Sequence, residues 1–210
     1  MNANRAAFPV CVVVLSACSG QAETLMTVSP DSTPPVQFSI DVWPGEGIPV
    51  IEAKRTVLRL RAAPDPASPV VDSIKGRIGQ RLAFDSTRFQ TIRSGSLKAV
   101  QPLRVVGRDM GETSHLTLAR YYHAQNQEVS IPVPAPGDIE YLQYRAEGTC
   151  FVRINRRVID AEPCPGFGKE SVEVVAHPAT RWWIRARGQS GMHGWLLVSD
   201  STAQSVRREF

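Results

Sequence analysis

The sequence predicts a mainly β protein of the small-barrel or sandwich kind, placed behind an N-terminal export segment and a flexible linker. Strand-like runs are short, and turn signals rich in Gly, Asn and Ser separate them at frequent intervals. Residues 79–100 and residues 137–160 each show the same series of glycine, strand, turn and strand. The chain of 210 residues has room for one large domain or two small ones.

Residues 1–17 have the order of features that a secretory signal requires. A short head with one charge, Arg5, is followed by the aliphatic run Val10 to Leu15 and then by small residues. The apolar run is too short to span a bilayer as a permanent helix. We therefore expect this segment to direct export and then to be removed.

The end of this segment, Leu15-Ser16-Ala17-Cys18, resembles the lipobox of bacterial lipoproteins. The resemblance implies cleavage before Cys18 and acylation of its sulfur and of the new amino terminus. Several acyl chains on one residue bind a membrane durably. Ser19 after the cysteine fits sorting to the periplasmic face of an outer membrane. The alternative is an ordinary signal peptide that is cut after Ala17 or later.

Residues 18–48 are predicted to form the lipidated cysteine and a flexible linker. Ser, Thr, Pro, Gln and Gly dominate residues 19–47, and such a composition cannot bury enough apolar surface to fold alone. We expect the linker to hold the folded part away from the membrane.

The four cysteines suggest one disulfide bond and no metal site. Cys11 leaves with the signal and Cys18 carries lipid, so Cys150 and Cys164 remain as a pair. An exported protein meets an oxidising compartment, in which such a pair forms a disulfide. A metal would need further ligands nearby, and the four histidines are scattered without a ligand spacing. We therefore expect neither a metal nor a cofactor.

The charge balance gives no indication of a nucleic-acid partner. The whole chain has a formal net charge of +4, and removal of residues 1–17 takes away one arginine and no acid, which leaves +3. Basic residues do gather in two stretches. We interpret both as solvated strand faces, with an anionic-ligand patch as the alternative. The two stretches are Arg153, Arg156 and Arg157, and Arg181, Arg185 and Arg187.

The closing hairpin is the clearest local signal in the chain. In residues 181–187 the alternation puts Trp182, Ile184 and Ala186 on one face and Trp183 with the arginines on the other. A glycine-rich turn then leads to a strand that begins at Trp195. Earlier in the chain, residues 112–126 are expected to be a connector that contains a short helix, and residues 201–210 are expected to be a C-terminal tail.

Two segments resemble bacterial SH3-like domains. Leu58-Arg59-Leu60-Arg61-Ala62-Ala63-Pro64-Asp65 is similar to their opening strand and turn, and Trp183-Ile184-Arg185 with Gly194-Trp195-Leu196 is similar to their closing hairpin. The resemblance implies two SH3-like barrels in tandem, over residues 49–111 and 127–200. The first lacks the Gly-Trp closure and the second lacks the usual opening. A single domain whose halves are separated by a long insertion is therefore the alternative.

No catalytic constellation appears in the sequence, so we do not expect an enzyme. Nucleophilic catalysis needs a nucleophile beside a base, and the cysteines are already assigned to lipid and disulfide. The family resemblance implies recognition of peptidoglycan or a cell-wall peptide. The candidate ligand-binding residues are Trp183, Arg185 and Trp195, and the alternative role of the two tryptophans is to fill the core. The alternative function is a structural or inhibitory lipoprotein that binds another envelope protein.

Overall fold

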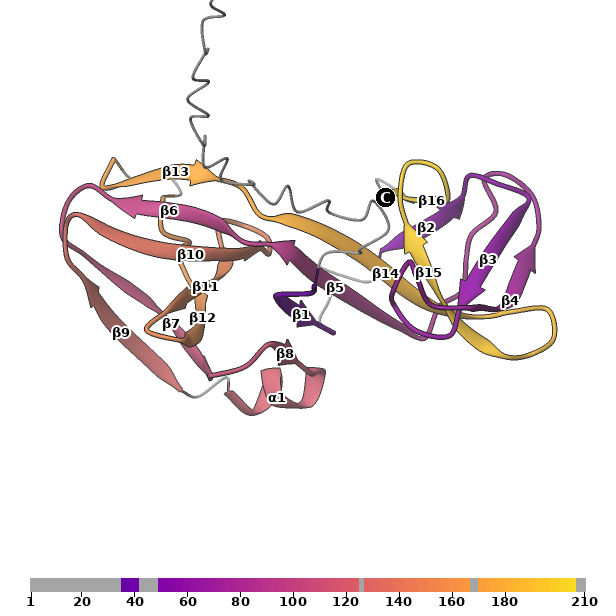
Figure 1. Ribbon diagram of the computed structural model, residues 1–210, viewed down its shortest axis with the longest axis horizontal. Helices are drawn as coiled ribbons and strands as arrows, with labels where there is room; N and C mark the ends of the chain where they lie inside the picture. The colour runs from indigo at the N-terminus through magenta and orange to yellow at the C-terminus, as the bar shows by residue number, and fades with distance from the viewer. Residues whose placement is uncertain (1–34, 42–48, 125–126, 167–169, 207–210) are drawn as a thin grey trace, which may run out of the picture. The chain divides into compact units, whose positions relative to one another are not determined.

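The computed structural model describes residues 35–41, 49–124, 127–166 and 170–206, which form a mainly β structure with one short helix (Figure 1). The chain divides into two units, 1–32 and 33–210, and every described residue belongs to the second. In chain order the elements are β1 (Phe38–Ile40), β2 (Val50–Ala53), β3 (Val57–Arg61), β4 (Val70–Lys75), β5 (Ser86–Arg93), β6 (Gly95–Ala99), β7 (Leu103–Gly111), β8 (His115–Leu116), α1 (Leu118–His123), β9 (Glu128–Val133), β10 (Gly137–Tyr144), β11 (Cys150–Ile154), β12 (Arg157–Ala161), β13 (Val172–Ala176), β14 (Ala179–Arg187), β15 (His193–Val198) and β16 (Ala203–Val206).

Sheet 1 has seven strands in the order β4-β3-β15-β14-β5-β1-β8. The long strand β14 lies at its centre and pairs antiparallel with β5 on one side and β15 on the other. Along β14, Ile184 and Ala186 are buried while Arg185 and Arg187 are exposed, as the period of two in a strand requires. The predicted alternation of the closing hairpin is thus confirmed.

Sheet 2 also has seven strands, in the order β13-β6-β10-β11-β12-β7-β9. β11 and β12 are joined by Asn155 and Arg156, whose φ angles of 49° and 69° are those of a tight two-residue hairpin turn. The strand β9 lies at one edge and carries Pro132, which cannot donate to a further strand. Strands β16 and β2 form a separate two-stranded sheet, sheet 3.

A two-stranded ribbon connects sheet 1 to sheet 2. β5 runs almost directly into β6, and β13 runs into β14, so that β5 pairs with β14 and β6 pairs with β13 (Figure 1). At the junction Gly95 lies tightly against the other strand, and a Cβ atom there would collide with the carbonyl oxygen of Ala176. The ribbon therefore needs glycine at this crossing.

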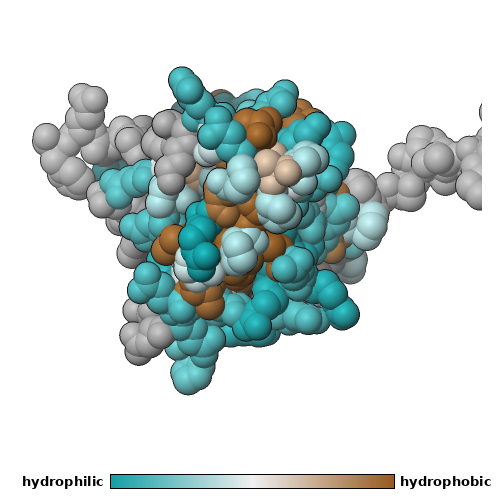
Figure 2. Space-filling model, turned by 90° about the vertical axis from the view of Figure 1, so that its left-hand side faces the viewer, coloured by the Kyte–Doolittle hydropathy of each residue, from teal (hydrophilic) through white to brown (hydrophobic). Residues whose placement is uncertain are grey.

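Three groups of buried apolar side chains hold the strands together. Core 1 joins sheets 1 and 3, core 2 lies where strands of sheets 1 and 2 meet, and core 3 belongs to sheet 2. At the sheet 2 end, Figure 2 shows apolar surface surrounded by hydrophilic side chains. Core 1 contains Ile51, Ala53, Leu58, Leu60, Leu82, Ile184, Leu196 and Ala203. Core 2 contains Phe38, Ile40, Met110, Leu116, Tyr121, Ala124, Leu142, Phe151 and Val158. Core 3 contains Leu97, Ala99, Val105, Val133, Ile139, Tyr141, Cys150, Val152, Ile154, Ile159, Ala161, Cys164 and Val172.

The structure is mainly β, as predicted, but two separate barrels over residues 49–111 and 127–200 are not confirmed. Each large sheet takes strands from both ranges, because β3 pairs with β15 in sheet 1 and β6 pairs with β10 in sheet 2. The opening segment around Leu60 and the closing hairpin around Trp195 thus share one sheet and one core.

Parts of the expected linker and of the expected tail are strands. β1 lies within the range 18–48, yet Phe38 and Ile40 are 0% and 1% exposed in core 2. β16 lies within the range 201–210, and its Ala203 is buried in core 1 beside β2. In both places the burial of a few apolar side chains stabilises a strand, although the surrounding sequence is polar.

The connector over residues 112–126 contains the predicted short helix. α1 spans Leu118–His123, and the Thr117 side chain accepts a hydrogen bond from the backbone N–H of Arg120, which is the usual N-cap contact. Immediately before it, β8 pairs in parallel with β1.

The signal segment and Cys18 lie outside the described residues, so lipidation stays a prediction. Within the described part of the chain, no helix has the length and apolar character needed to cross a membrane.

Cys150 and Cys164 lie at disulfide distance, with their sulfur atoms 2.05 Å apart. Cys150 is the first residue of β11, and Cys164 lies on the loop after β12. Both residues are buried in core 3. The bond thus fastens this loop to sheet 2.

Removal of this bond is expected to lower the free energy of unfolding by about 3 kcal/mol, because a cross-link of this loop length restricts the unfolded chain. Urea unfolding of the oxidised protein, the reduced protein and a Cys150→Ala/Cys164→Ala variant measures the change. The double variant serves as the control, since reductant must leave its stability unchanged. Free thiols at both positions in protein taken directly from its native compartment would refute the assignment.

Candidate functional site

One face of sheet 1 carries most of the arginine and tryptophan side chains of this sheet. In the register, Trp195 lies opposite both Arg61 and Arg185, and Trp183 lies opposite Arg88. Because side chains of directly paired residues point to the same face, four strands contribute to one surface. We call this surface the arginine face and define it by Arg59, Arg61, Arg88, Trp183, Arg185 and Trp195.

Two cavities open on the arginine face, and Trp195 lines both of them. The first has a volume of about 480 Å³ and is also lined by Trp183, Pro66 and three arginines. The second has a volume of about 560 Å³ and lies between sheet 1 and the start of α1. Both volumes fall in the range of small-molecule sites. The three arginines of the first cavity are Arg55, Arg59 and Arg61, and the charged residues of the second are Asp41, Arg88, Arg185 and His193.

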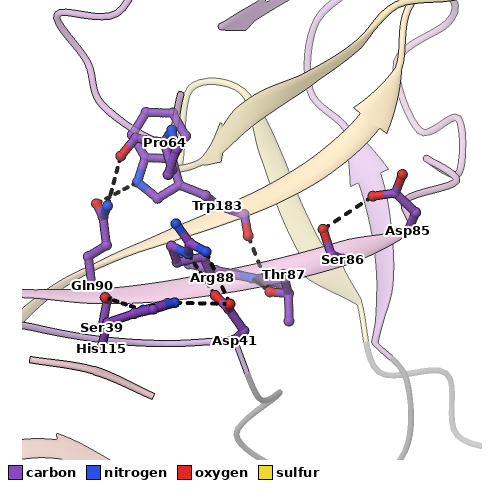
Figure 3. A network of polar contacts seen from close by, with 11 residues as sticks. Ser39, Asp41, Pro64, Asp85, Ser86, Thr87, Arg88, Gln90, His115 and Trp183 are labelled. Atoms are coloured by element: carbon purple, nitrogen blue, oxygen red, sulfur yellow. Dashed lines mark hydrogen bonds and ion pairs between the residues drawn. The ribbon is translucent and has the colours of Figure 1, made fainter. Parts of the chain in front are cut away.

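Trp183 forms the buried floor of this region. It is 1% exposed, and its indole Nε1 donates a hydrogen bond of 2.9 Å to Oε1 of Gln90 (Figure 3). The amide nitrogen of Gln90 in turn donates to the carbonyl oxygen of Pro64 at 2.8 Å. One glutamine therefore fixes both the indole ring and the loop that follows β3.

An ion-pair network holds Arg88 beside Trp195. Its guanidinium makes two hydrogen bonds to the Asp41 carboxylate, at 2.6 and 3.0 Å, and lies 5.2 Å from the centroid of the Trp195 ring system. Asp41 also contacts Nε2 of His115 at 3.3 Å, and Nδ1 of that histidine lies 2.8 Å from the Ser39 hydroxyl (Figure 3). Arg88 is thus already neutralised by an acid of the protein.

The first cavity, by contrast, has no acidic residue among the described residues that line it. Arg61 donates to the carbonyl oxygen of Ser68 at 2.6 Å, a bond that leaves its positive charge uncompensated. Across the described ranges, no ion pair involves Arg55, Arg59 or Arg185. Guanidinium groups are suited to bidentate contacts with carboxylates and phosphates, so the cavity can bind an anionic group.

The structure brings the three candidate residues together, with different exposures. Trp195 is half-buried between the cavities, Arg185 is exposed in the second, and Trp183 is buried beneath the first. Sequence reasoning missed Arg59 and Arg88. Alternation in β3 already put Arg59 on the polar face of its strand, whereas nothing in the sequence related Arg88 to Trp195.

Ser190 and His193 lie at the turn between β14 and β15, and their polar side chains have separate acidic partners. Ser190 donates to the Asp72 carboxylate at 2.6 Å, and hydrogen bonds from this turn lower the pKa of Asp72. His193 pairs instead with Asp85 at 2.7 Å. No group of three or more metal-ligating side chains occurs in the residues that the structure describes.

Comparisons with known proteins give no relative. No family model, no curated protein and no solved structure matches this chain.

Replacement of Gln90 by leucine is expected to lower the free energy of unfolding by about 1–3 kcal/mol, because the buried N–H of Trp183 loses its acceptor. Thermal and urea unfolding measure the change. The control is Gln101→Leu at an exposed position, which is expected to stay within about 0.5 kcal/mol of the parent protein. Equal stability of the two variants would show that the Gln90 contacts contribute nothing.

Proposed function

We propose that this protein is a lipid-anchored, non-catalytic binding module of a bacterial cell envelope that holds peptidoglycan or a cell-wall peptide on its arginine face. The supporting observation is the first cavity, where three arginines that have no acidic partner among the described residues lie beside the Trp195 ring. Carboxylate groups of a wall peptide would bind the guanidinium groups, and an apolar part of the ligand would pack on the indole.

The two segments that resemble SH3-like domains also support this proposal, because they contain residues of the arginine face. The opening segment that is similar to SH3-like domains supplies Arg59 and Arg61, and the closing hairpin supplies Arg185 and Trp195. These are the segments that meet in sheet 1. Lipid on Cys18 would hold the module at the periplasmic face of the outer membrane, within reach of the wall.

A sedimentation assay with insoluble peptidoglycan sacculi tests this function. The full chain, purified in detergent, is mixed with sacculi at low and high salt, beside the variants Arg59→Glu, Arg185→Glu and Trp195→Ala. We expect the parent protein to sediment and each variant to bind at least about tenfold more weakly, a loss of 1.4 kcal/mol. Binding of the parent should also fall with salt, because exposed charges are screened.

The matched control is Arg77→Glu, which makes the same charge change at an exposed arginine outside both cavities. If Arg77→Glu weakened sedimentation as much as Arg59→Glu does, the attraction to sacculi would be non-specific. That result would contradict the proposed site. Absence of sedimentation at both salt concentrations would contradict wall binding itself.

The alternative function is binding to another envelope protein, and one surface favours it. β13 is an edge strand of sheet 2, and its Val174 and Val175 are 41% and 59% exposed. An edge strand with exposed valines can add a strand from a partner. Cross-linking in intact cells from a residue placed at Val175 would capture such a partner, and this result combined with no sedimentation would favour the alternative.

A further inference from the structure

A second pair of cavities lies on sheet 2 and its junction with β14. Both cavities are lined by the rings of Tyr141, Tyr144 and His177, so they adjoin one another. Their volumes are about 260 and 300 Å³, which together fall in the range of small-molecule sites. No residue lining them lines either cavity of the arginine face. We call the pair the tyrosine pocket.

The two halves of the tyrosine pocket differ in chemistry. Leu97, Pro165 and Val174 make one half apolar, whereas Gln143 and Thr180 bring hydrogen-bonding groups to the other. A ligand that fills both halves must therefore have an apolar side and a polar side.

The ring walls are held in place by the fold. Tyr141 is 5% exposed, and its ring centroid lies 6.2 Å from that of His177. The hydroxyl of Tyr144 accepts a hydrogen bond from the backbone N–H of Gly148 at 3.3 Å, while 47% of this residue stays exposed. Burial raises the pKa of Tyr141. Flat surfaces held in this way suit a ligand with a ring.

Gln143 has hydrogen-bonding capacity that the protein does not use. The residue is 3% exposed, and its Oε1 has no hydrogen-bond partner among the described residues. A half-turn of the terminal torsion exchanges the oxygen and nitrogen positions, so the amide can offer either group to the cavity that it lines. A buried amide in this state is available to a ligand hydroxyl or N–H.

The charges of the tyrosine pocket favour a neutral ligand. None of its lining residues is acidic. Its arginine, Arg145, donates a hydrogen bond of 2.8 Å to the buried carboxylate of Asp160, which also accepts one from Arg108, so the charge of Arg145 is compensated in part. This arrangement contrasts with the first cavity of the arginine face, where the arginines lack an acidic partner in the part of the chain that the structure describes.

We propose that the tyrosine pocket binds a neutral sugar ring of an oligosaccharide. The apolar face of such a ring would pack on Tyr144 and Tyr141, and its hydroxyl or acylamino groups would bond to Gln143. The site does not depend on the function proposed for the arginine face, since the two share no residue.

Titration calorimetry with two neutral oligosaccharides tests this site. The probes are tri-N-acetylchitotriose and cellotriose, added to the full chain in detergent up to about 10 mM. We expect saturable binding of at least one probe, and at least a fivefold loss of affinity in Tyr144→Ala and in Gln143→Leu. Unfolding curves of both variants identify any loss that reflects a failure to fold.

The matched control is Tyr122→Ala on α1, where a tyrosine that is 58% exposed lies outside the tyrosine pocket. This variant and Arg59→Glu must bind the probe as the parent does. Absence of binding by either probe, or equal losses in Tyr122→Ala and Tyr144→Ala, would overturn the sugar site. Neither outcome affects sedimentation with sacculi through the arginine face, so the two proposals fail separately.

Discussion

Replacement of Trp183 by alanine is expected to lower the free energy of unfolding by about 3–5 kcal/mol. The side chain is among the largest that are fully buried in the described chain, and its removal leaves a cavity under the loop after β3. The lost indole N–H also leaves Oε1 of Gln90 without its donor. Urea unfolding followed by circular dichroism measures this change.

Two further variants separate the parts of this effect. Trp183→Phe retains most of the apolar volume but removes the N–H donor, and we expect it to cost about 1–2 kcal/mol. Trp195→Ala removes the same kind of side chain from a half-buried position, and we expect a smaller loss of stability together with the loss of wall binding. Equal destabilisation by Trp183→Ala and Trp195→Ala would contradict the assignment of Trp183 to the core.

Asp160→Ala is expected to cost about 3 kcal/mol of unfolding free energy, because it removes the shared acidic partner of two arginines. The Asp160 side chain is 1% exposed, and Arg108 and Arg145 each donate to its Oδ2 at 2.8 Å. Both arginine side chains are 24% exposed, so water can solvate their charges once the carboxylate is gone. The loss therefore stays at the lower end of the range for broken buried pairs. Chemical unfolding at neutral pH measures it.

The control for this variant is an exposed pair. Glu112 lies 3.1 Å from Arg156, with side-chain exposures of 58% and 84%, so Glu112→Gln is expected to change stability by less than about 1 kcal/mol. A similar loss in both variants would show that burial does not strengthen the Asp160 pairs.

Asp160→Asn gives an independent readout through Tyr121. Burial raises the pKa of Tyr121, the negative charge of Asp160 raises it further, and the two arginines lower it. Removal of the negative charge while the arginines remain must therefore lower this pKa. A titration of ¹³C-labelled tyrosine by NMR follows the change, and a pKa that stays constant or rises would exclude the electrostatic coupling.

Local features of this fold could be predicted from the sequence because they depend on neighbouring residues. The alternation in β14 and the short helix in the connector both rest on signals within a few positions. The cysteine pair followed from the count of cysteines in a chain that we expect to be exported. Burial of β1 could not be predicted, because Phe38 and Ile40 form too short a pattern within a stretch rich in Ser, Thr and Pro.

The pairing of distant strands explains why the sheet arrangement and part of the arginine face could not be predicted. β3 pairs with β15 and β1 pairs with β5, and no local pattern identifies either partner. Only some residues of the arginine face could therefore be predicted from the sequence. Trp183, Arg185 and Trp195 lie close together in the sequence, whereas Arg59 and Arg88 join them only after the sheet has formed.

The pairing of β3 with β15 also sets the order in which the chain can fold during synthesis. β3 and β2 are synthesised long before their partners β15 and β16. Contacts between such distant segments form slowly, and the early strands expose unpaired edges in the meantime. Deletion of β16 would therefore leave β2 without its partner in sheet 3. We expect a nascent chain of this protein to stay prone to aggregation until β15 and β16 have been synthesised.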